Sequence, residues 1–177
     1  MGLCKVVLFI ASSLDGYIAT EEHNLDWLFT VEGEGDNGYS KFYDTVDTVL
    51  MGRITYDWII EHEKQIFPYK DKECYVFSRT KKDNNEHVTF ISDEVVQFTN
   101  KLKNRNSGNI WVVGGGDLVH SFIKNKLIDE LIITVAPVLL GTGIPLFKSN
   151  GFQTPLSLKS INRYNQFVEL HYEIVKQ

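Results

Sequence analysis

Apolar residues along the chain fall into short runs that alternate with segments of helical periodicity. The first run, Leu3 to Ala11, is rich in Val and Ile, which is typical of a strand buried on both faces of a parallel sheet. Further short strands are predicted at Thr48–Met51, Glu73–Phe77, Val88–Ile91 and Ile110–Val113, and helices between them at Gly38–Val46, Thr55–His62, Asp93–Arg105 and Asp117–Lys126. Alternating strands and helices with right-handed crossovers predict an α/β fold, with a single mostly parallel central sheet and helices on both faces.

The rhythm changes after Asp129. Glu130–Val138 is a long apolar strand, and the strands Leu156–Ile161 and Gln166–Val175 are separated only by a short turn at Asn162–Asn165. Such a close pair predicts an antiparallel C-terminal hairpin at one edge of the sheet. Because an apolar edge is safest when it is paired, Glu130–Val138 and the aromatic-rich ending Tyr164–Tyr172 predict a homodimer.

Composition favours one domain over residues 1–177. Hydrophobic residues make up 43% of the 177 residues and aromatic residues 12%, which is enough for one buried core. Cys4 and Cys74 are far apart and outside any Cys-x-x-Cys pattern, so the sequence predicts no disulfide and no metal site. With no signal-like or membrane-length apolar segment, we expect a cytoplasmic protein with no membrane partner. The net charge of −5 argues against a nucleic-acid partner.

The candidate chemistry begins at a run of glycines. Within Ile110–Ile123, a short apolar strand is followed by Gly114, Gly115 and Gly116 and then by a helical pattern. Residues without a Cβ let the backbone adopt positive φ and approach a ligand, and the amino end of the next helix offers N–H groups to an anion. The pattern indicates a phosphate cradle, although a tight strand-to-helix turn without a ligand explains it too.

Two other predicted strands end in groups that bind phosphate. One strand ends at Met51 and is followed by Gly52, Arg53 and Thr55. Another ends at Phe77 and is followed by Ser78 and Arg79. Arginine binds a phosphomonoester through charge-assisted hydrogen bonds, and serine or threonine donates to it. Each group alone could be an ordinary helix start or a solvated loop charge. Together at successive strand ends, where open α/β sheets bind ligands, they predict NADPH rather than NADH.

Two loops near the first strand remain open to interpretation. Asp15-Gly16 reads first as an Asx turn that holds Gly16 at positive φ, in a loop where a flat nicotinamide ring could lie. The polar segment Thr20–Asn37 is either an active-site lid or an ordinary solvated loop, and Lys81–Glu86 is a second candidate for a flexible loop.

These motifs, in this order, resemble the dihydrofolate reductase-like superfamily over nearly the whole chain. The matching stretches are Ala-Ser-Ser-Leu-Asp-Gly-Tyr-Ile-Ala, Met-Gly-Arg-x-Thr-Tyr, Phe-Ser-Arg-Thr, Gly-Gly-Gly-Asp-Leu and Pro-Val-Leu-Leu-Gly-x-Gly. Within the superfamily, the chain is most similar to the branch containing the reductase domain of the riboflavin-biosynthesis deaminase-reductase. The zinc-binding deaminase motifs of that enzyme are absent from this sequence.

The resemblance implies a site for NADPH. By resemblance, Ala11 and Ile18 would meet the nicotinamide, and Ser78 and Arg79 would bind the 2′-phosphate. The remaining cofactor residues would hold the other phosphates: Gly52, Arg53 and Thr55 on the adenosine side, and Gly115, Gly116, Asp117 and Leu118 along the pyrophosphate. Members of the superfamily transfer hydride from NADPH to a heterocycle or its sugar imine.

A catalytic acid is less clear from the sequence. Asp36 precedes Met51-Gly52 at a spacing similar to the pterin-binding acid of dihydrofolate reductase, and Thr134 matches the hydroxyl that partners it. Asp36 also reads, with preference, as the N-cap of the helix predicted at Gly38–Val46. If it were buried against Trp27, Phe42 or Tyr43, its raised pKa would let it deliver a proton; otherwise ordered water would do so.

The expected function is an NADPH-dependent reductase acting on a pyrimidine-type or pterin-type heterocycle or a ribosylamino compound, similar to the 5-amino-6-(5-phosphoribosylamino)uracil reductase of riboflavin biosynthesis. Dihydrofolate reductase activity, a non-catalytic protein that binds NADPH or a pterin, and a purely structural dimerisation domain are the alternatives.

Overall fold

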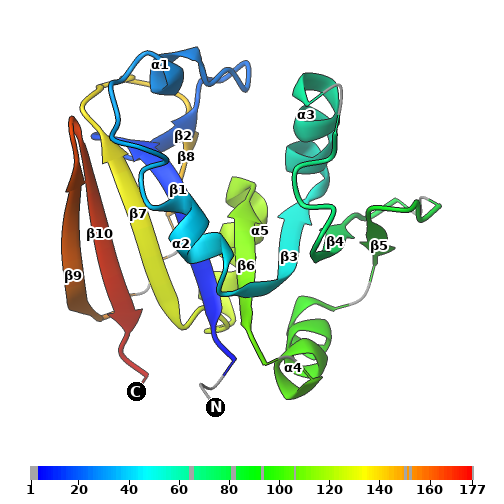
Figure 1. The fold of residues 1–177 in the computed structure, drawn as a ribbon. Coiled ribbons are helices and arrows are strands. Elements are labelled where there is room, and N and C mark those ends of the chain that lie inside the picture. The colour runs from blue at the N-terminus through cyan, green and yellow to red at the C-terminus, as the bar shows by residue number, and fades with distance from the viewer. Residues whose placement is uncertain are drawn as a thin grey trace.

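The computed structural model describes residues 4–63, 66–80, 83–92, 94–105, 107–149, 151 and 153–176. Its main sheet contains β1 (Val6–Ser13), β3 (Val46–Gly52), β4 (Glu73–Phe77), β5 (Thr89–Ile91), β6 (Asn109–Gly114), β7 (Glu130–Ala136), β9 (Leu156–Tyr164) and β10 (Phe167–Ile174). The strand order is β5-β4-β3-β6-β1-β7-β10-β9 (Figure 1). Strands from β5 to β7 are parallel, whereas β10 runs antiparallel to β7 and β9 antiparallel to β10. The predicted fold class, including the C-terminal hairpin, is confirmed.

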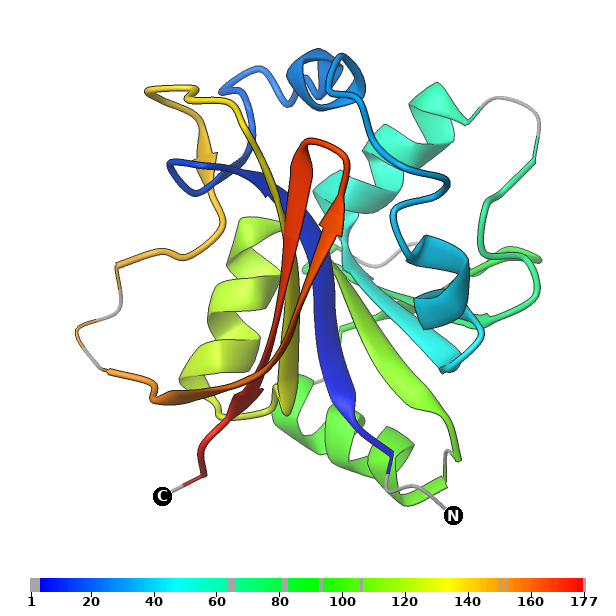
Figure 2. The ribbon, with the colours of Figure 1, turned by 60° about the vertical axis from the view of Figure 1, so that its left-hand side comes forward.

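Helices cover both faces of the sheet. They are α1 (Asp26–Phe29), α2 (Tyr39–Tyr43), α3 (Arg53–His62), α4 (Val95–Arg105) and α5 (Gly116–Lys124). Side chains of α2 and α3 pack on one face around Val49 and Trp111, and we call this the α2 face. Side chains of α4 and α5 pack on the other, the α5 face, around Leu8 and Ile110 (Figure 2). No helix in the described ranges is long and apolar enough to cross a membrane.

A second, two-stranded sheet lies beside the carboxyl ends of the parallel strands. It pairs β2 (Tyr17–Ala19) with β8 (Ile144–Pro145), and α1 lies near it in Figure 1. Gly143 makes the pairing possible, because a Cβ at this residue would lie 2.3 Å from the carbonyl oxygen of Ala19. The sequence analysis missed this sheet because its two strands are very short and distant in sequence.

The helix predicted at Gly38–Val46 is shorter than expected. It begins after Gly38, which has φ +80°, and ends at Tyr43. Thr45 terminates it, since its backbone N–H and its hydroxyl both donate to the carbonyl oxygen of Phe42. Val46 therefore belongs to β3 and is fully buried in the sheet.

The C-terminal hairpin forms an edge of the sheet as predicted, but the apolar strand that was expected to need pairing as an edge is not one. The strand expected at Glu130–Val138 ends at Ala136 and lies inside the sheet, between β1 and β10. The real edge is β9, whose residues are all exposed except the last, Tyr164. The hairpin turn consists of Asn165 and Gln166, with Asn165 at φ +55°. The turn therefore ends one residue later than predicted, and Asn162 to Tyr164 belong to the strand β9.

The two predicted flexible loops are held by specific hydrogen bonds. The segment Thr20–Asn37 contains the short helix α1, which the sequence analysis did not expect. In the second loop, Lys81 and Lys82 lie outside the described residues. Beyond them, the Asn84 side chain accepts from the N–H of Phe90, and the Asn85 side chain accepts from the N–H groups of the two residues that precede β5.

Most other boundaries shift by two or three residues. The first strand begins at Val6 and continues to Ser13, and Leu3 lies outside the described residues. The helix expected from Asp93 is described from Val95, and Asp93 itself lies outside the described ranges. Helix α5 stops at Lys124, since Lys126 adopts φ +55°.

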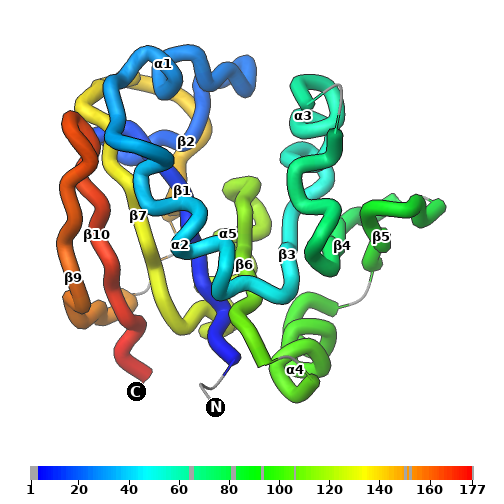
Figure 3. The backbone as a smooth tube through the Cα atoms, viewed as in Figure 1, coloured from blue at the N-terminus to red at the C-terminus, as the bar shows by residue number. Residues whose placement is uncertain are grey.

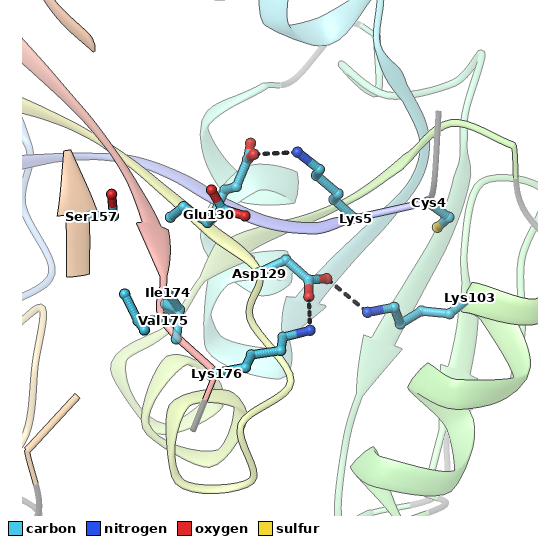
Figure 4. A pocket seen from close by; sticks show the side chains of 10 residues that line it. Cys4, Lys5, Lys103, Asp129, Glu130, Ser157, Ile174, Val175 and Lys176 are labelled. Carbon is cyan, nitrogen blue, oxygen red and sulfur yellow. Dashed lines mark hydrogen bonds and ion pairs between the residues drawn. The ribbon is translucent and has the colours of Figure 1, made fainter. Parts of the chain in front are cut away.

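A cluster of ion pairs closes the amino ends of the central strands. Figure 3 shows both chain termini at this end of the sheet. Asp129 accepts a hydrogen bond from the backbone N–H of Val6 at 2.9 Å, and Figure 4 shows it between the ammonium groups of Lys103, at 2.7 Å, and Lys176. Beside it, Glu130 pairs with Lys5 at 2.5 Å. These side chains line a cavity of about 520 Å³. The cluster joins β1, α4 and the end of the chain to β7.

Asp129 is expected to stabilise the fold mainly above acidic pH. Burial raises the pKa of Asp129. The two ammonium groups and the Val6 N–H lower it by more than burial raises it, so the pKa lies below its usual value. Its contribution is therefore complete above the unfolded-state pKa, about 3.9, and is lost as the pH falls through the folded-state pKa. We expect Asp129→Asn to lower the free energy of unfolding by about 1.5–3 kcal/mol at pH 7. Urea unfolding at pH 7 and at pH 3 measures this.

Glu22→Gln, at an exposed position, is the control and should leave the unfolding midpoint unchanged. An Asp129→Asn deficit that is equally large at both pH values would show that the Asp129 charge does not act in this way.

Candidate functional site

The candidate site lies where two neighbouring parallel strands diverge. Strands β3 and β6 pair directly, with Met51 opposite Gly114 at their carboxyl ends. Helix α3 leaves β3 toward the α2 face, and α5 leaves β6 toward the α5 face. Chains that separate in this way leave a crevice outside the strand ends, and open α/β sheets bind ligands there.

The amino end of α5 opens into this crevice. Gly114 has φ +145°, and Gly115, the N-cap of α5, has φ +60° and ψ 138°, a conformation almost restricted to glycine. No side chain caps the helix, so the N–H groups of its first turn have no side-chain acceptor. A nine-residue helix directs a partial positive charge to this point, which favours an anion.

The other glycines of the site are required for different reasons. Gly116 does not adopt a positive φ; a Cβ there would lie 3.2 Å from the carbonyl oxygen of Pro145, so this glycine lets β8 pack against α5. The sequence analysis attributed all three glycines to backbone freedom, which is wrong for Gly116. Gly52 has ordinary space, since its nearest contact would be the carbonyl oxygen of Gly114 at 3.7 Å.

The three predicted phosphate-binding segments converge. A Cβ on Gly115 would lie 3.3 Å from the hydroxyl of Thr55, which joins the starts of α3 and α5. Arg53 donates to Thr80 at 3.3 Å, and the hydroxyl of Ser78 donates to the carbonyl oxygen of Thr80 at 2.9 Å, so the loop after β4 lies against the start of α3. Arg53 also pairs with Asp57 at 2.6 Å, which neutralises part of its charge.

Positive charge surrounds the start of α5. Asp117, in the first turn, forms an ion pair with Lys148, and this pair lowers the pKa of Asp117. Burial opposes the shift, while the charges of Arg79 and His120 support it. The fourth predicted cradle residue, Leu118, is buried under the helix and packs in the core. Lys148 escaped the sequence analysis, because it is 31 residues from Asp117 and nothing in the spacing connects them.

The residues predicted near the nicotinamide lie on β1 and β2. Ala11 and Ile18 are both partly exposed. Ala11 lies on the α2 face and is paired in register with Thr134 of β7, which is only 7% exposed. Ile18 packs with the core of the α5 face. Thr134 therefore lies beside Ala11, whereas Ile18 packs on the opposite face, and no described contact joins Thr134 to Asp36, the partner that the resemblance implied for it.

Asp36 is positioned as a helix cap. Its two carboxylate oxygens accept from the backbone N–H groups of Gly38 at 3.0 Å and Ser40 at 2.8 Å, and its side chain is exposed. These bonds, led by those from Ser40, lower its pKa. The hypothesis that burial against aromatic rings raises this pKa is therefore wrong. The N-cap of α2 is Gly38 rather than Asp36 as predicted, although the Asp36 carboxylate accepts from the N–H of Ser40 in the first turn of the helix.

Asp15 does more than form a turn. Gly16 has φ +87°, as predicted, but the Asp15 carboxylate accepts from the hydroxyl of Ser13 at 2.6 Å and from the backbone N–H groups of Leu140 at 3.1 Å and Gly141 at 2.7 Å. These bonds, that of Ser13 first, lower its pKa. Asp15 thus fastens the loop after β7 to the turn after β1.

The described residues contain no group of three His, Cys, Asp or Glu side chains that could hold a metal ion. The candidate site is instead a crevice lined by glycine backbone and positive charge.

Comparison with known proteins identifies the family. The profile of the RibD C-terminal domain matches residues 4–170. The chain belongs to the RibD C-terminal domain family. It is 53% identical to the uncharacterized protein YwjB of Bacillus subtilis (strain 168) over 172 residues, covering 95% of this chain and 97% of YwjB. It is 33% identical to YyaP of the same organism, covering 89% of this chain and 87% of YyaP.

Solved structures agree with this assignment. A crystal structure of a Shewanella sp. PV-4 protein, whose name connects it with riboflavin biosynthesis, has a TM-score of 0.89 and 29% identity, covering 97% of this chain and 99% of that one. The Thermotoga maritima diaminohydroxyphosphoribosylaminopyrimidine deaminase/5-amino-6-(5-phosphoribosylamino)uracil reductase has a TM-score of 0.71 and 15% identity. The match covers 97% of this chain but 57% of that enzyme, and it shows a shared fold.

Substitution of two site glycines should have opposite outcomes. We expect Gly115→Ala to lower the free energy of unfolding by about 1–3 kcal/mol, because a Cβ is strained at this φ and ψ and crowds the Thr55 hydroxyl. Gly52→Ala, at an ordinary φ of −78° with no close contact, is the matched control and should change stability little. Urea unfolding compares the variants, and equal losses would mean that the conformation of Gly115 is not strained.

Proposed function

We propose that this protein is an NADPH-dependent reductase, and that its substrate is a pyrimidine-type or pterin-type heterocycle or a ribosylamino compound, as in riboflavin biosynthesis. The observation that carries the proposal is the uncapped amino end of α5 at the divergence of β3 and β6, with Arg53, Arg79 and Lys148 around it. Membership of the RibD C-terminal domain family supports it.

The residues present fit a dinucleotide with an additional phosphate. Gly115 turns the backbone so that the first N–H groups of α5, which have no side-chain cap, could donate to a pyrophosphate. Ser78 and Arg79 supply a hydroxyl and an exposed guanidinium for a 2′-phosphate, the feature that separates NADPH from NADH. Ala11 and Ile18 offer small and apolar surface for the nicotinamide, which supplies the hydride when bound.

The protein residues contribute binding and orientation, and water supplies the proton. Asp36 is an anionic cap with a lowered pKa, so it has no proton to give near neutrality. The same observation favours the second candidate function, a non-catalytic protein that binds NADPH or a pterin. Oxidation of NADPH by the purified protein over a panel of pyrimidine and pterin substrates separates the two. We place this activity in the cytoplasm.

NADPH should bind more tightly than NADH. The loss of one charge-assisted hydrogen bond typically weakens binding by about 1.5–3 kcal/mol, or roughly ten- to a hundredfold. We expect calorimetry to show this ratio for the parent protein and a much smaller ratio for Arg79→Ala. Arg163→Ala removes another exposed arginine, on the C-terminal hairpin, and is the control. Equal dissociation constants of the parent for the two cofactors would reject the 2′-phosphate role.

We further propose that the homodimer forms through β9. This strand is one of the two edge strands of the main sheet, and it exposes Leu156 (43%), Leu158 (51%) and Ile161 (59%). An open edge with an apolar row pairs most simply with the same strand of a second copy, related by a two-fold axis. Sedimentation equilibrium should give twice the mass of the chain for the parent, and the mass of one chain for Ile161→Lys. A monomeric parent protein would reject the dimer.

A further inference from the structure

Two glutamates are buried in the described part of the main sheet, and they differ in their partners. Glu130 is 7% exposed and Glu169 is 6% exposed. Glu130 pairs with Lys5 at 2.5 Å and with His171 at 3.0 Å. Glu169 has no ion pair with any lysine, arginine or histidine that the structure describes. A buried carboxylate without a cation is costly and therefore needs an explanation.

The protein groups around Glu169 are neutral. The side-chain amide of Asn162 donates to one of its oxygens at 2.8 Å. Tyr164, on the same strand as Asn162, has a pKa raised first by burial and then by the charge of Glu169, to which its hydroxyl also donates a hydrogen bond. An ionised carboxylate has about four acceptor positions, so two neutral donors leave it only partly satisfied.

Glu169 lies in the same row as the candidate site. Directly paired residues run across four adjacent strands, and such pairs point to one face of a sheet: Ala11 of β1, Thr134 of β7, Glu169 of β10 and Asn162 of β9. The row lies on the α2 face, two residues from the carboxyl ends of β1 and β7. Glu130, in contrast, lies at the amino end of β7.

The segment between α1 and α2 reaches the tip of the hairpin that carries Glu169. The backbone N–H of Gln166 donates to the carbonyl oxygen of Glu32 at 3.2 Å. This backbone bond fixes the segment against the hairpin beside the row that contains Glu169.

We propose that Glu169, together with Thr134, binds the edge of the substrate heterocycle that carries a ring N–H next to an exocyclic amino group. Two adjacent N–H donors in one plane match the two oxygens of a carboxylate. In the complex they would occupy the acceptor positions of Glu169 that no protein donor fills. The Thr134 hydroxyl, directly beside Glu169, adds a donor or an acceptor. The inference rests on the proposed function in one respect: it places the ring on the α2 face beside Ala11, where the nicotinamide is proposed to lie.

Glu169 fits this role better than Asp36. Both carboxylate oxygens of Asp36 already accept backbone N–H groups, and the side chain is exposed to water. Water competes for an exposed carboxylate, whereas a buried one gains more from each ligand hydrogen bond. Binding rather than proton donation is the role that follows.

The test uses isocytosine, a flat ring with adjacent N–H and amino groups, and 1,3-dimethyluracil, which has no N–H donor. Chemical-shift titration of backbone amide signals follows weak binding, with the full-length protein saturated with NADPH and without it. We expect isocytosine to bind the parent at least tenfold more tightly than 1,3-dimethyluracil and to shift signals around Thr134 and Glu169. Glu169→Gln should remove this preference. Glu173→Gln, on the same strand but paired with Lys159 at the surface, is the matched control and should keep it.

Thr134→Val is the second variant, in case Glu169→Gln does not fold, and it should weaken isocytosine binding severalfold. The inference is overturned if isocytosine shows no preference over 1,3-dimethyluracil, or if Glu169→Gln folds and keeps the preference. It is also overturned if Asp36→Asn loses the preference while Glu169→Gln retains it. Failure of NADPH to bind the parent would instead count against the proposed function, and it is read separately from the isocytosine titration.

Discussion

The divergence of the chain after two adjacent strands, β3 and β6, is the constraint on which the rest of the candidate site depends. Helices α3 and α5 leave these two strands toward opposite faces of the sheet. Gly115 must then turn the chain sharply enough to begin α5 beside Thr55, and only glycine adopts its backbone angles without strain. The contact of Arg53 with the loop after β4 follows at the same end of the sheet.

The pairing of charged side chains differs between the two ends of the sheet. At the amino ends, Asp129 pairs with two lysines, and Glu130 pairs with Lys5 and lies in contact with the His171 ring. At the carboxyl ends, Arg53 pairs with Asp57 and Lys148 pairs with Asp117, whereas Glu169 is buried without an ion pair to any described cation. A carboxylate buried in this way is better explained by a ligand that donates hydrogen bonds to it than by folding.

Local patterns predicted the fold and the position of the glycine turn at the start of α5. Apolar runs identified the strands, and the glycine run identified the start of α5, because these features depend on neighbouring residues. Contacts between distant segments were not predictable. The ion pair of Lys148 with Asp117, the pairing of β2 with β8 and the bonds from Asp15 to the loop after β7 all join residues that no sequence period connects.

The substrate half of the site shows the same limit in a sharper form. Spacing drew attention to Asp36, whose position before Met51 resembles a known acid, although its side chain only caps α2. Glu169 lies in an alternating strand pattern like any other surface acid, and only the register of β10 against β7 places it beside Thr134. Burial then distinguishes it, since a folded chain rarely encloses a carboxylate without a cation.

A reductase and a binding protein would share all of these contacts and would differ only in how a proton reaches the substrate. A carboxylate that accepts two N–H groups from a ring must stay ionised, so Glu169 cannot bind the ring in this way and also donate a proton to it. Asp36 is anionic for a different reason, because its capping bonds stabilise the charged form. Proton transfer at this site is therefore left to water. A reductase therefore needs a path by which water reaches the reacting atom beside Ala11, and a protein that only binds the cofactor needs none.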